Sequence, residues 1–175
     1  MKYWNRSMIL KVYYPHVIFN TIVFSKTYTL FLVTLIVGDT GSGKTTQIPQ
    51  YILENASEKY DPCRIFFSQP RRLAAISGAQ RIADERGQEL GIDIGYQVRL
   101  ESRNSSTTNC ILCTHGVLLR TLMGSKTSNG DSVANITHII LDEVHERDKF
   151  ADFLLIELRR MINSHGSRTY FIIWV

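Results

Sequence analysis

Hydrophobic and polar positions alternate in blocks along most of the chain. From residue 28 onward, short unbroken apolar runs predict buried strands at 29–37, 63–67, 109–113, 137–141 and 169–175. Amphipathic patterns between these runs predict helices at 44–57, 72–86, 116–123 and 150–163. Buried strands separated by helices are typical of a parallel sheet that is covered on both faces. The pattern therefore predicts an α/β fold with three layers and a mostly parallel sheet.

The first 27 residues do not share this pattern. They are rich in tyrosine, phenylalanine, isoleucine and valine, contain no acidic residue and show no clear period. We therefore expect a poorly determined segment at 1–27 and one domain at 28–175. The apolar stretch 17–37 is about as long as a membrane helix, but Lys26 places a charge near its middle. We expect no membrane span, because a spanning helix tolerates few charges.

The composition changes this picture little. A length of 175 residues with 44% hydrophobic and 21% charged residues is ordinary for one globular domain. The net charge is +4, but residues 1–37 contain four basic residues and no acidic one. Since the whole chain has 20 basic and 16 acidic residues, the remainder is neutral overall. A nucleic-acid site would have to be a local basic patch rather than a global positive field.

The cysteines indicate a cellular compartment but no metal site. An odd number, Cys63, Cys110 and Cys113, without a secretory signal predicts a reducing, intracellular location, cytoplasmic or nuclear. Cys110 and Cys113 have the C-x-x-C spacing of a zinc ligand pair. They lie in a predicted strand, however, where residues three apart point to opposite faces. One zinc ion could not easily take both thiolates.

The predicted strand at 29–37 leads into the segment GDTGSGKTT, residues 38–46. This segment matches G-x-x-x-x-G-K-[ST] through Gly38, Gly43, Lys44 and Thr45, and a predicted helix follows it. Glycines let the backbone curl so that successive N–H groups face an anion, and the helix adds its positive N-terminal end. Lys44 would bind the β- and γ-phosphates of ATP, and the Thr45 hydroxyl would reach Mg²⁺. The segment predicts a nucleotide-binding P-loop.

Two adjacent carboxylates, Asp142 and Glu143, end the predicted strand at 137–141. A solvated strand end would explain them without any function. A P-loop ATPase, however, needs carboxylates at the end of a second strand, close to its Mg²⁺. We predict that Asp142 and Glu143 both belong to the Mg²⁺ site, with Asp142 holding the ion, and that Glu143 also orients and deprotonates the attacking water.

Four segments in the expected order resemble motifs I, Ia, Ib and II of the DEAH/RNA helicase A group of superfamily 2 helicases. They are GDTGSGKTTQIPQY at 38–51, QPRRLAA at 69–75, THGVLLR at 114–120 and DEVHERD at 142–148. GYQVRLES at 95–102 resembles a further stretch of that group. Within it, the sequence most resembles the members near RNA helicase A and the YTH-domain-containing helicase. The resemblance covers roughly residues 35–168 and implies a RecA-like P-loop NTPase fold, use of ATP and Mg²⁺, and RNA as partner.

The resemblance also implies residue roles. Motif I implies a nucleotide-binding loop made of Gly38, Asp39, Thr40, Gly41, Ser42, Gly43, Lys44, Thr45 and Thr46. Motifs Ia and Ib imply contacts to the RNA backbone from Arg71, Arg72, Thr114 and Gly116, although an arginine pair alone is more often a solvated helix start. Arg81 corresponds to the arginine that stacks on adenine, although by itself it is a helix-surface residue. His145 resembles the motif II histidine that links the nucleotide site to the following domain.

The family continues into an S-A-T motif and a second RecA-like domain, which carries arginine fingers and half of the ATP and RNA sites. Here the sequence reaches YFIIWV, residues 170–175, at about the place where S-A-T begins. We therefore expect one RecA-like domain of a longer helicase, nearly inactive when isolated. A catalytically incomplete nucleotide- and RNA-binding fragment, or a P-loop ATPase acting on another substrate, are the alternatives.

Overall fold

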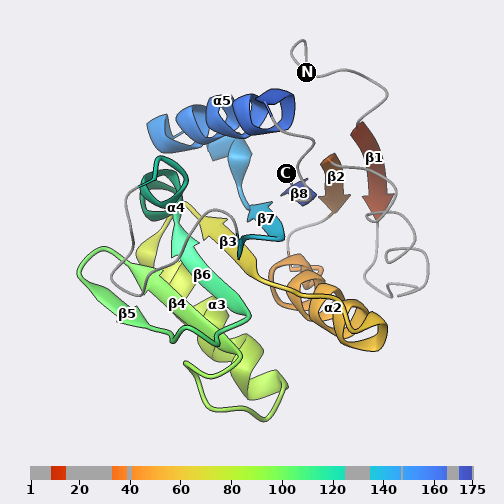
Figure 1. Ribbon diagram of the computed structural model, residues 1–175, viewed down its shortest axis with the longest axis vertical. Coiled ribbons are helices and arrows are strands. Elements are labelled where there is room, and N and C mark those ends of the chain that lie inside the picture. Colours follow the sequence, from red (N-terminus) through yellow and green to blue (C-terminus); the bar gives the residue numbers. More distant parts are fainter. Residues whose placement is uncertain are drawn as a thin grey trace.

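The computed structural model describes residues 9–14, 33–38, 41–124, 135–146, 148–164 and 170–174. Within them lies one sheet with the strand order β1-β2-β8-β7-β3-β6-β4-β5 (Figure 1). Its strands are β1 Ile9–Tyr14, β2 Val33–Gly38, β3 Ile65–Gln69, β4 Ile94–Val98, β5 Glu101–Arg103, β6 Cys110–Thr114, β7 His138–Leu141 and β8 Tyr170–Trp174. Neighbouring strands in this part of the chain pair in parallel except for β4 and β5, which form an antiparallel hairpin. The mostly parallel sheet is confirmed.

Helices cover both faces of the sheet. Figure 1 shows α2 and α3 on one side and α4 and α5 on the other. Their bounds are α2 Lys44–Lys59, α3 Arg72–Glu85, α4 His115–Leu122 and α5 Lys149–Ser164. Each differs from its predicted range by at most two residues at either end. The three-layer α/β fold is therefore confirmed.

Two apolar clusters fill the space between the layers. One joins the sheet to α2 and α3 through residues such as Ile48 and Ile82, and the other joins it to α4 and α5 through residues such as Leu118 and Leu158. Cys110 belongs to the first cluster and Cys113 to the second. The two thiols of the C-x-x-C pair thus lie on opposite faces, as predicted. All three cysteines are free.

Two parts of the sheet were not predicted from the pattern. β1 lies within the segment 1–27 and pairs in parallel with β2, from Ile9 opposite Val33 to Tyr14 opposite Gly38. The hairpin β4–β5 lies in the GYQVRLES stretch, where Gly95 interrupts the apolar run. A Cβ at Gly95 would lie 2.5 Å from the backbone oxygen of Arg103. The glycine that obscures the strand in the sequence is thus what lets the hairpin close.

The expectations about a membrane span and about the division of the chain concern residues that the structure describes only in part. In the described residues, no helix combines the length and the apolar character that crossing a membrane requires. Residues 1–8 and 15–32 lie outside the part of the chain that the structure describes. The division into 1–27 and 28–175 therefore stays a prediction.

The fold brings the candidate functional segments to one edge of the sheet. In parallel strands the carboxyl ends lie at the same edge, which is where α/β proteins bind their ligands. β2 ends at Gly38, β3 at Gln69, β6 at Thr114 and β7 at Leu141. Each of these ends leads directly into one of the four segments identified in the sequence. The register confirms the alignment, because Gln69 lies opposite Thr114 and Ser68 lies opposite Leu141.

Candidate functional site

The loop between β2 and α2 has the backbone of an anion cradle. Gly41 and Gly43 have φ angles of 78° and 82°, in the left-handed region that favours glycine. Gly43 caps α2, which has no side-chain cap hydrogen bond and no acidic residue in its first turn. The positive end of the helix is therefore available to an anion. Asp39 and Thr40 of the predicted loop lie outside the described residues.

The polar side chains of this loop lie close to its backbone. The Lys44 ammonium donates to the Ser42 hydroxyl over 3.4 Å. The Thr46 hydroxyl donates to the backbone oxygen of Gly43 over 3.3 Å, which ties the first turn of α2 to the cap. Lys44 thus lies folded over the loop, where it can meet a phosphate.

Thr45 and Asp142 meet although they lie far apart in the sequence. The Thr45 hydroxyl donates to Asp142 Oδ2 over 3.1 Å. Asp142 directly follows β7 and is only 4% exposed. Its other oxygen, Oδ1, accepts from the backbone N–H of Glu143 over 2.9 Å. The predicted metal ligands from the P-loop and from the acidic pair are therefore brought together.

The chemistry of this pair fits Mg²⁺. Burial, together with the charge of Glu143, raises the pKa of Asp142 from 3.8 to about 6, although the hydrogen bond from Thr45 opposes this shift. A buried carboxylate with a raised pKa gains from a nearby cation. Mg²⁺ prefers hard oxygen ligands and is commonly held by one or two carboxylates together with substrate phosphates. Thr45 and Asp142 would hold the ion, which would supply positive charge to the phosphates.

Replacing Asp142 by asparagine should separate stability from metal binding. The raised pKa means that the folded chain binds more protons than the unfolded chain between about pH 4 and pH 6, so this group's contribution to stability falls as pH rises through about 6. At neutral pH the buried charge costs up to about 3 kcal/mol. We expect Asp142→Asn to raise the unfolding temperature near pH 7.5, to change it much less near pH 4, and to lose any stabilisation by Mg²⁺ and ATP. Thermal unfolding at both pH values checks this, and an unfolding temperature lower than wild type near pH 7.5 would contradict it.

Glu143 takes a different position from its neighbour. It is exposed, and its φ of 52° places it in the left-handed region, which is uncommon for a residue other than glycine. Its carboxylate lies 3.1 Å from His145 Nε2. Strained backbone of this kind is often found at functional sites. The two acids of the pair thus differ in their surroundings, since Asp142 is buried beside Thr45 and Glu143 is accessible to solvent.

Arg81 lies on α3 in a network centred on Glu85. Arg81 Nε donates to one oxygen of Glu85 over 3.0 Å, and the side chains of Gln47 and Gln50 donate to the other. The network joins α3 to the first two turns of α2. Arg81 is therefore held beside the helix that begins at the phosphate cradle, while its side chain remains 71% exposed.

The predicted RNA contacts lie at the starts of α3 and α4. Arg71 and Arg72 are exposed at the start of α3, and each pairs with an acid. Thr114 caps α4 in an extended conformation and makes no side-chain cap hydrogen bond. A Cβ at Gly116 would meet only ring atoms of Phe150, at 3.7 Å, so packing does not require glycine there. The four residues are brought to the same edge as the cradle.

Three contacts to the segment 142–148 were not predicted. Gln69, which is 3% exposed, donates to Asp142 Oδ2 over 3.3 Å. Arg71 donates to Glu146 over 2.7 Å. His115, which is 2% exposed, lies 2.5 Å from Asp148 through its Nδ1 atom. The sequence places these partners next to predicted site residues, but only the strand order shows that they meet.

Asp148 has two structural tasks. It accepts from the backbone N–H groups of Phe150 and Ala151, which caps α5, and it accepts from His115. Burial opposes its ionisation, but the hydrogen bonds from His115 and Ala151 outweigh it and lower the pKa of Asp148. Its contribution to stability is therefore present above about pH 4 and is lost as pH falls through the lowered pKa.

We expect Asp148→Ala to destabilise the fold by about 2 kcal/mol or more, because it removes a helix cap and leaves His115 buried without this partner. Asp152→Ala is the matched control, since Asp152 is an exposed acid in the first turn of the same helix. The control should cost less than about 1 kcal/mol. Denaturant unfolding near pH 7 measures both variants, and equal losses would contradict the assignment.

Comparison with known proteins gives the family. Residues 19–169 match the DEAD/DEAH box helicase family. The chain is 48% identical over 134 residues to the DExH-box ATP-dependent RNA helicase DExH6 of Arabidopsis thaliana, which covers 76% of this chain and 10% of that protein. It is 47% identical over 141 residues to the probable ATP-dependent RNA helicase spindle-E of Culex quinquefasciatus, covering 81% of this chain and 10% of that protein. It is 50% identical over 132 residues to the putative ATP-dependent RNA helicase DHX57 of Mus musculus, covering 74% of this chain and 9% of that protein.

The chain therefore spans about a tenth of the length of these relatives. The matched region contains all four segments that meet at the carboxyl edge of the sheet. Two features of the structure agree with the family match over most of the sequence. They are the anion cradle before α2 and the contact between Thr45 and Asp142. The chain belongs to the DEAD/DEAH box helicase family.

Proposed function

We propose that this chain is the ATP-binding domain of an ATP-dependent RNA helicase, in which it binds ATP with Mg²⁺, hydrolyses the ATP and contacts RNA. The contact between Thr45 and Asp142 carries the proposal. It brings the phosphate cradle of α2 and the acidic pair after β7 to one place. The names of the relatives, all ATP-dependent RNA helicases, support RNA as the substrate.

The chain supplies groups that bind the phosphates and groups that activate the attacking water. The backbone of the loop at 41–43 and the Lys44 ammonium bind and orient the phosphates. Glu143, which is exposed at the end of the acidic pair, accepts the proton of the attacking water. The water oxygen then forms a bond to the γ-phosphorus, and the bond to the ADP oxygen breaks. Asp142 stays ionised and holds its place through Thr45 and Gln69.

Arg81 and His145 have supporting roles in this proposal. Arg81 is placed beside the first turns of α2 by Glu85, where it can stack on the adenine base. His145 contacts Glu143 and is half exposed, so it can also meet a neighbouring domain. A second RecA-like domain is the partner that we propose for this edge, where it would complete the ATP and RNA sites.

RNA would bind where α3 and α4 begin. The guanidinium groups of Arg71 and Arg72 can hold phosphate oxygens, and the start of α4 at Thr114 and Gly116 offers backbone N–H groups. The absence of a packing need for glycine at Gly116 is consistent with close approach of a ligand backbone. Three free cysteines and an RNA substrate fit a reducing, intracellular compartment.

The test is ATP turnover by the purified protein with and without single-stranded RNA. RNA-stimulated release of phosphate is the expected result, at a very low rate when the second RecA-like domain that we propose as partner is absent. RNA binding without turnover would indicate a nucleotide- and RNA-binding part that lacks catalysis. Turnover that ignores RNA, with no RNA binding, would indicate a P-loop ATPase for another substrate.

A further inference from the structure

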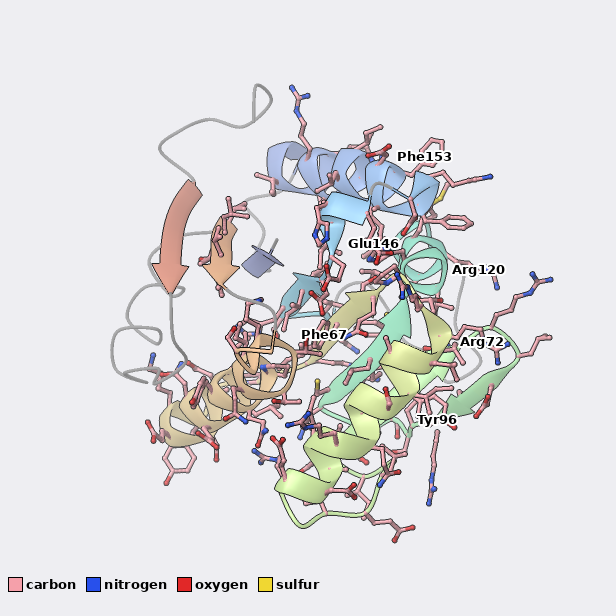
Figure 2. All side chains as sticks on the ribbon, turned by 180° about the vertical axis from the view of Figure 1, so that it is seen from behind. Phe67, Arg72, Tyr96, Arg120, Glu146 and Phe153 are labelled. Carbon is pink, nitrogen blue, oxygen red and sulfur yellow. The ribbon has the colours of Figure 1, made fainter. Side chains whose placement is uncertain are left out.

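The two arginines proposed to bind RNA are each paired with a carboxylate. Arg71 donates to Glu146 over 2.7 Å, and Arg72 lies 3.5 Å from Glu101. Figure 2 labels Glu146, which lies in the segment after β7, and Arg72, at the start of α3. RNA phosphates would have to take the place of these acids. The two acids, however, belong to very different parts of the fold.

Glu146 is connected to Glu143, the proposed catalytic base, through the backbone that follows it. It ends the 3-10 turn Val144–Glu146, which begins directly after Glu143. Its backbone N–H donates to the backbone oxygen of Glu143 over 2.9 Å. The same turn carries His145, whose Nε2 lies 3.1 Å from the Glu143 carboxylate. A displacement of Glu146 therefore acts on both the backbone and the side-chain contact of Glu143.

Glu101 is placed elsewhere. It lies on β5, at the far edge of the sheet from the P-loop strand β2. One of its carboxylate oxygens accepts from the Tyr96 hydroxyl over 2.6 Å. The hairpin β4–β5 is thus its anchor, and β6 and β3 separate it from β7 in the sheet. Glu101 neutralises Arg72 in a similar way but has no such connection to Glu143.

We propose that Glu146 couples RNA binding to ATP hydrolysis. Its ion pair with Arg71 restrains the 3-10 turn, and an RNA phosphate that binds Arg71 breaks this pair and releases the turn. This inference rests on the proposed function and names the residue that regulates it. The pair is accessible to solvent, with the Arg71 side chain 74% and the Glu146 side chain 33% exposed, so its net strength is small and a phosphate can replace it. Release of the turn frees Glu143 from its arrangement with His145 and lets it turn toward the attacking water.

Coupling of this kind is reciprocal. If RNA shifts the turn toward the hydrolytic arrangement, a change that favours this arrangement without removing an RNA contact should also raise RNA affinity. Removing the Glu146 charge therefore has two expected effects. It frees Arg71 for RNA, and it gives the turn in the absence of RNA part of the freedom that RNA confers.

The test compares Glu146→Gln with Glu101→Gln in purified protein. Both variants should bind single-stranded RNA more tightly, by up to about fivefold, because each frees an exposed arginine. Only Glu146→Gln should raise ATP turnover without RNA, also by up to about fivefold, and so lower the ratio of stimulated to basal rate. Equal basal rates and equal stimulation ratios in the two variants would overturn the coupling. Thermal unfolding confirms that both variants remain folded.

Arg71→Ala tests the same pair from the other side. It should raise the basal rate of ATP turnover, because the turn loses the ion pair that restrains it. RNA affinity should fall, because an arginine proposed to bind phosphate is removed. Combined with Glu146→Gln, it should add nothing further to the basal rate, since both substitutions break one contact. A basal rate that stays at the wild-type value in Arg71→Ala would overturn the inference. Wild-type turnover that ignores RNA would instead contradict the proposed function, and the coupling with it.

Discussion

Replacing Glu143 by glutamine should stop ATP hydrolysis while ATP binding remains. The amide keeps the shape of the side chain but cannot accept the proton of the attacking water. Loss of a general base typically costs about 10²–10⁴-fold in rate. Because Glu143 is exposed, the substitution leaves no buried group without a partner. We therefore expect a large fall in kcat and an intact fold.

ATP affinity should stay equal or rise in this variant. The charge of Glu143 contributes to the raised pKa of Asp142, so its removal makes Asp142 easier to ionise beside Thr45. An ionised Asp142 is the form that holds Mg²⁺. Phosphate release and equilibrium binding of a fluorescent ATP analogue measure the two effects separately.

The matched control is Glu58→Gln, an exposed acid near the end of α2. It removes the same charge far from the acidic pair and should change neither rate nor affinity. Unchanged hydrolysis in Glu143→Gln would move the catalytic base to another residue. Lost ATP binding in that variant would mean that Glu143 acts mainly in holding the nucleotide.

The sequence alone places the candidate site residues on the right elements of the fold where these residues are neighbours in the chain. Gly43, Lys44 and Thr45 are adjacent in the chain, so their spacing alone specifies a loop that meets a helix start. Asp142 and Glu143 are also adjacent and follow an apolar run that ends at Leu141. For residues that are adjacent in the chain, the pattern of apolar positions and the residue types together predict which helix or strand carries them and at which end they lie.

The contacts between segments could not be predicted in the same way. Gln69 reaches Asp142 because β3 lies beside β7, and His115 reaches Asp148 because α4 lies beside α5. The spacing of residues along the chain does not show which elements lie side by side, because the order of strands in this sheet differs from their order in the sequence. The pairing of Arg71 with Glu146 could not be predicted for the same reason, because it also depends on which strands are neighbours.

Irregular backbone was the other source of error. Gly95 breaks an apolar run that the structure shows to be strand β4, and Leu100 has a φ of 67° in the turn that joins β4 to β5. Pattern alone favours a loop at such places. The close approach of Gly95 to Arg103 is a packing constraint that appears only once the hairpin is seen.

Replacing Lys44 by alanine should weaken ATP binding at least tenfold. A hydrogen bond to a charged group contributes about 1.5–3 kcal/mol, which corresponds to roughly 10- to 150-fold in affinity. Lys44 is the first residue of α2 and lies over the loop of Gly41 and Gly43, so its loss removes a phosphate contact at the cradle. Helix propensity does not oppose the change, because alanine is the best helix former.

Lys59→Ala is the control for this variant, because Lys59 lies at the other end of the same helix, is exposed, and carries the same charge. If the field of the helix or the net charge determined affinity, both substitutions would weaken ATP binding to a similar extent. If the cradle determines it, only Lys44→Ala should do so, and the loss should be similar for ATP and for inorganic triphosphate, since Lys44 meets phosphates and not the base. Titration of both ligands against the wild type and the two variants decides between these outcomes. Equal ATP affinity in Lys44→Ala and wild type would show that the nucleotide does not bind at this loop.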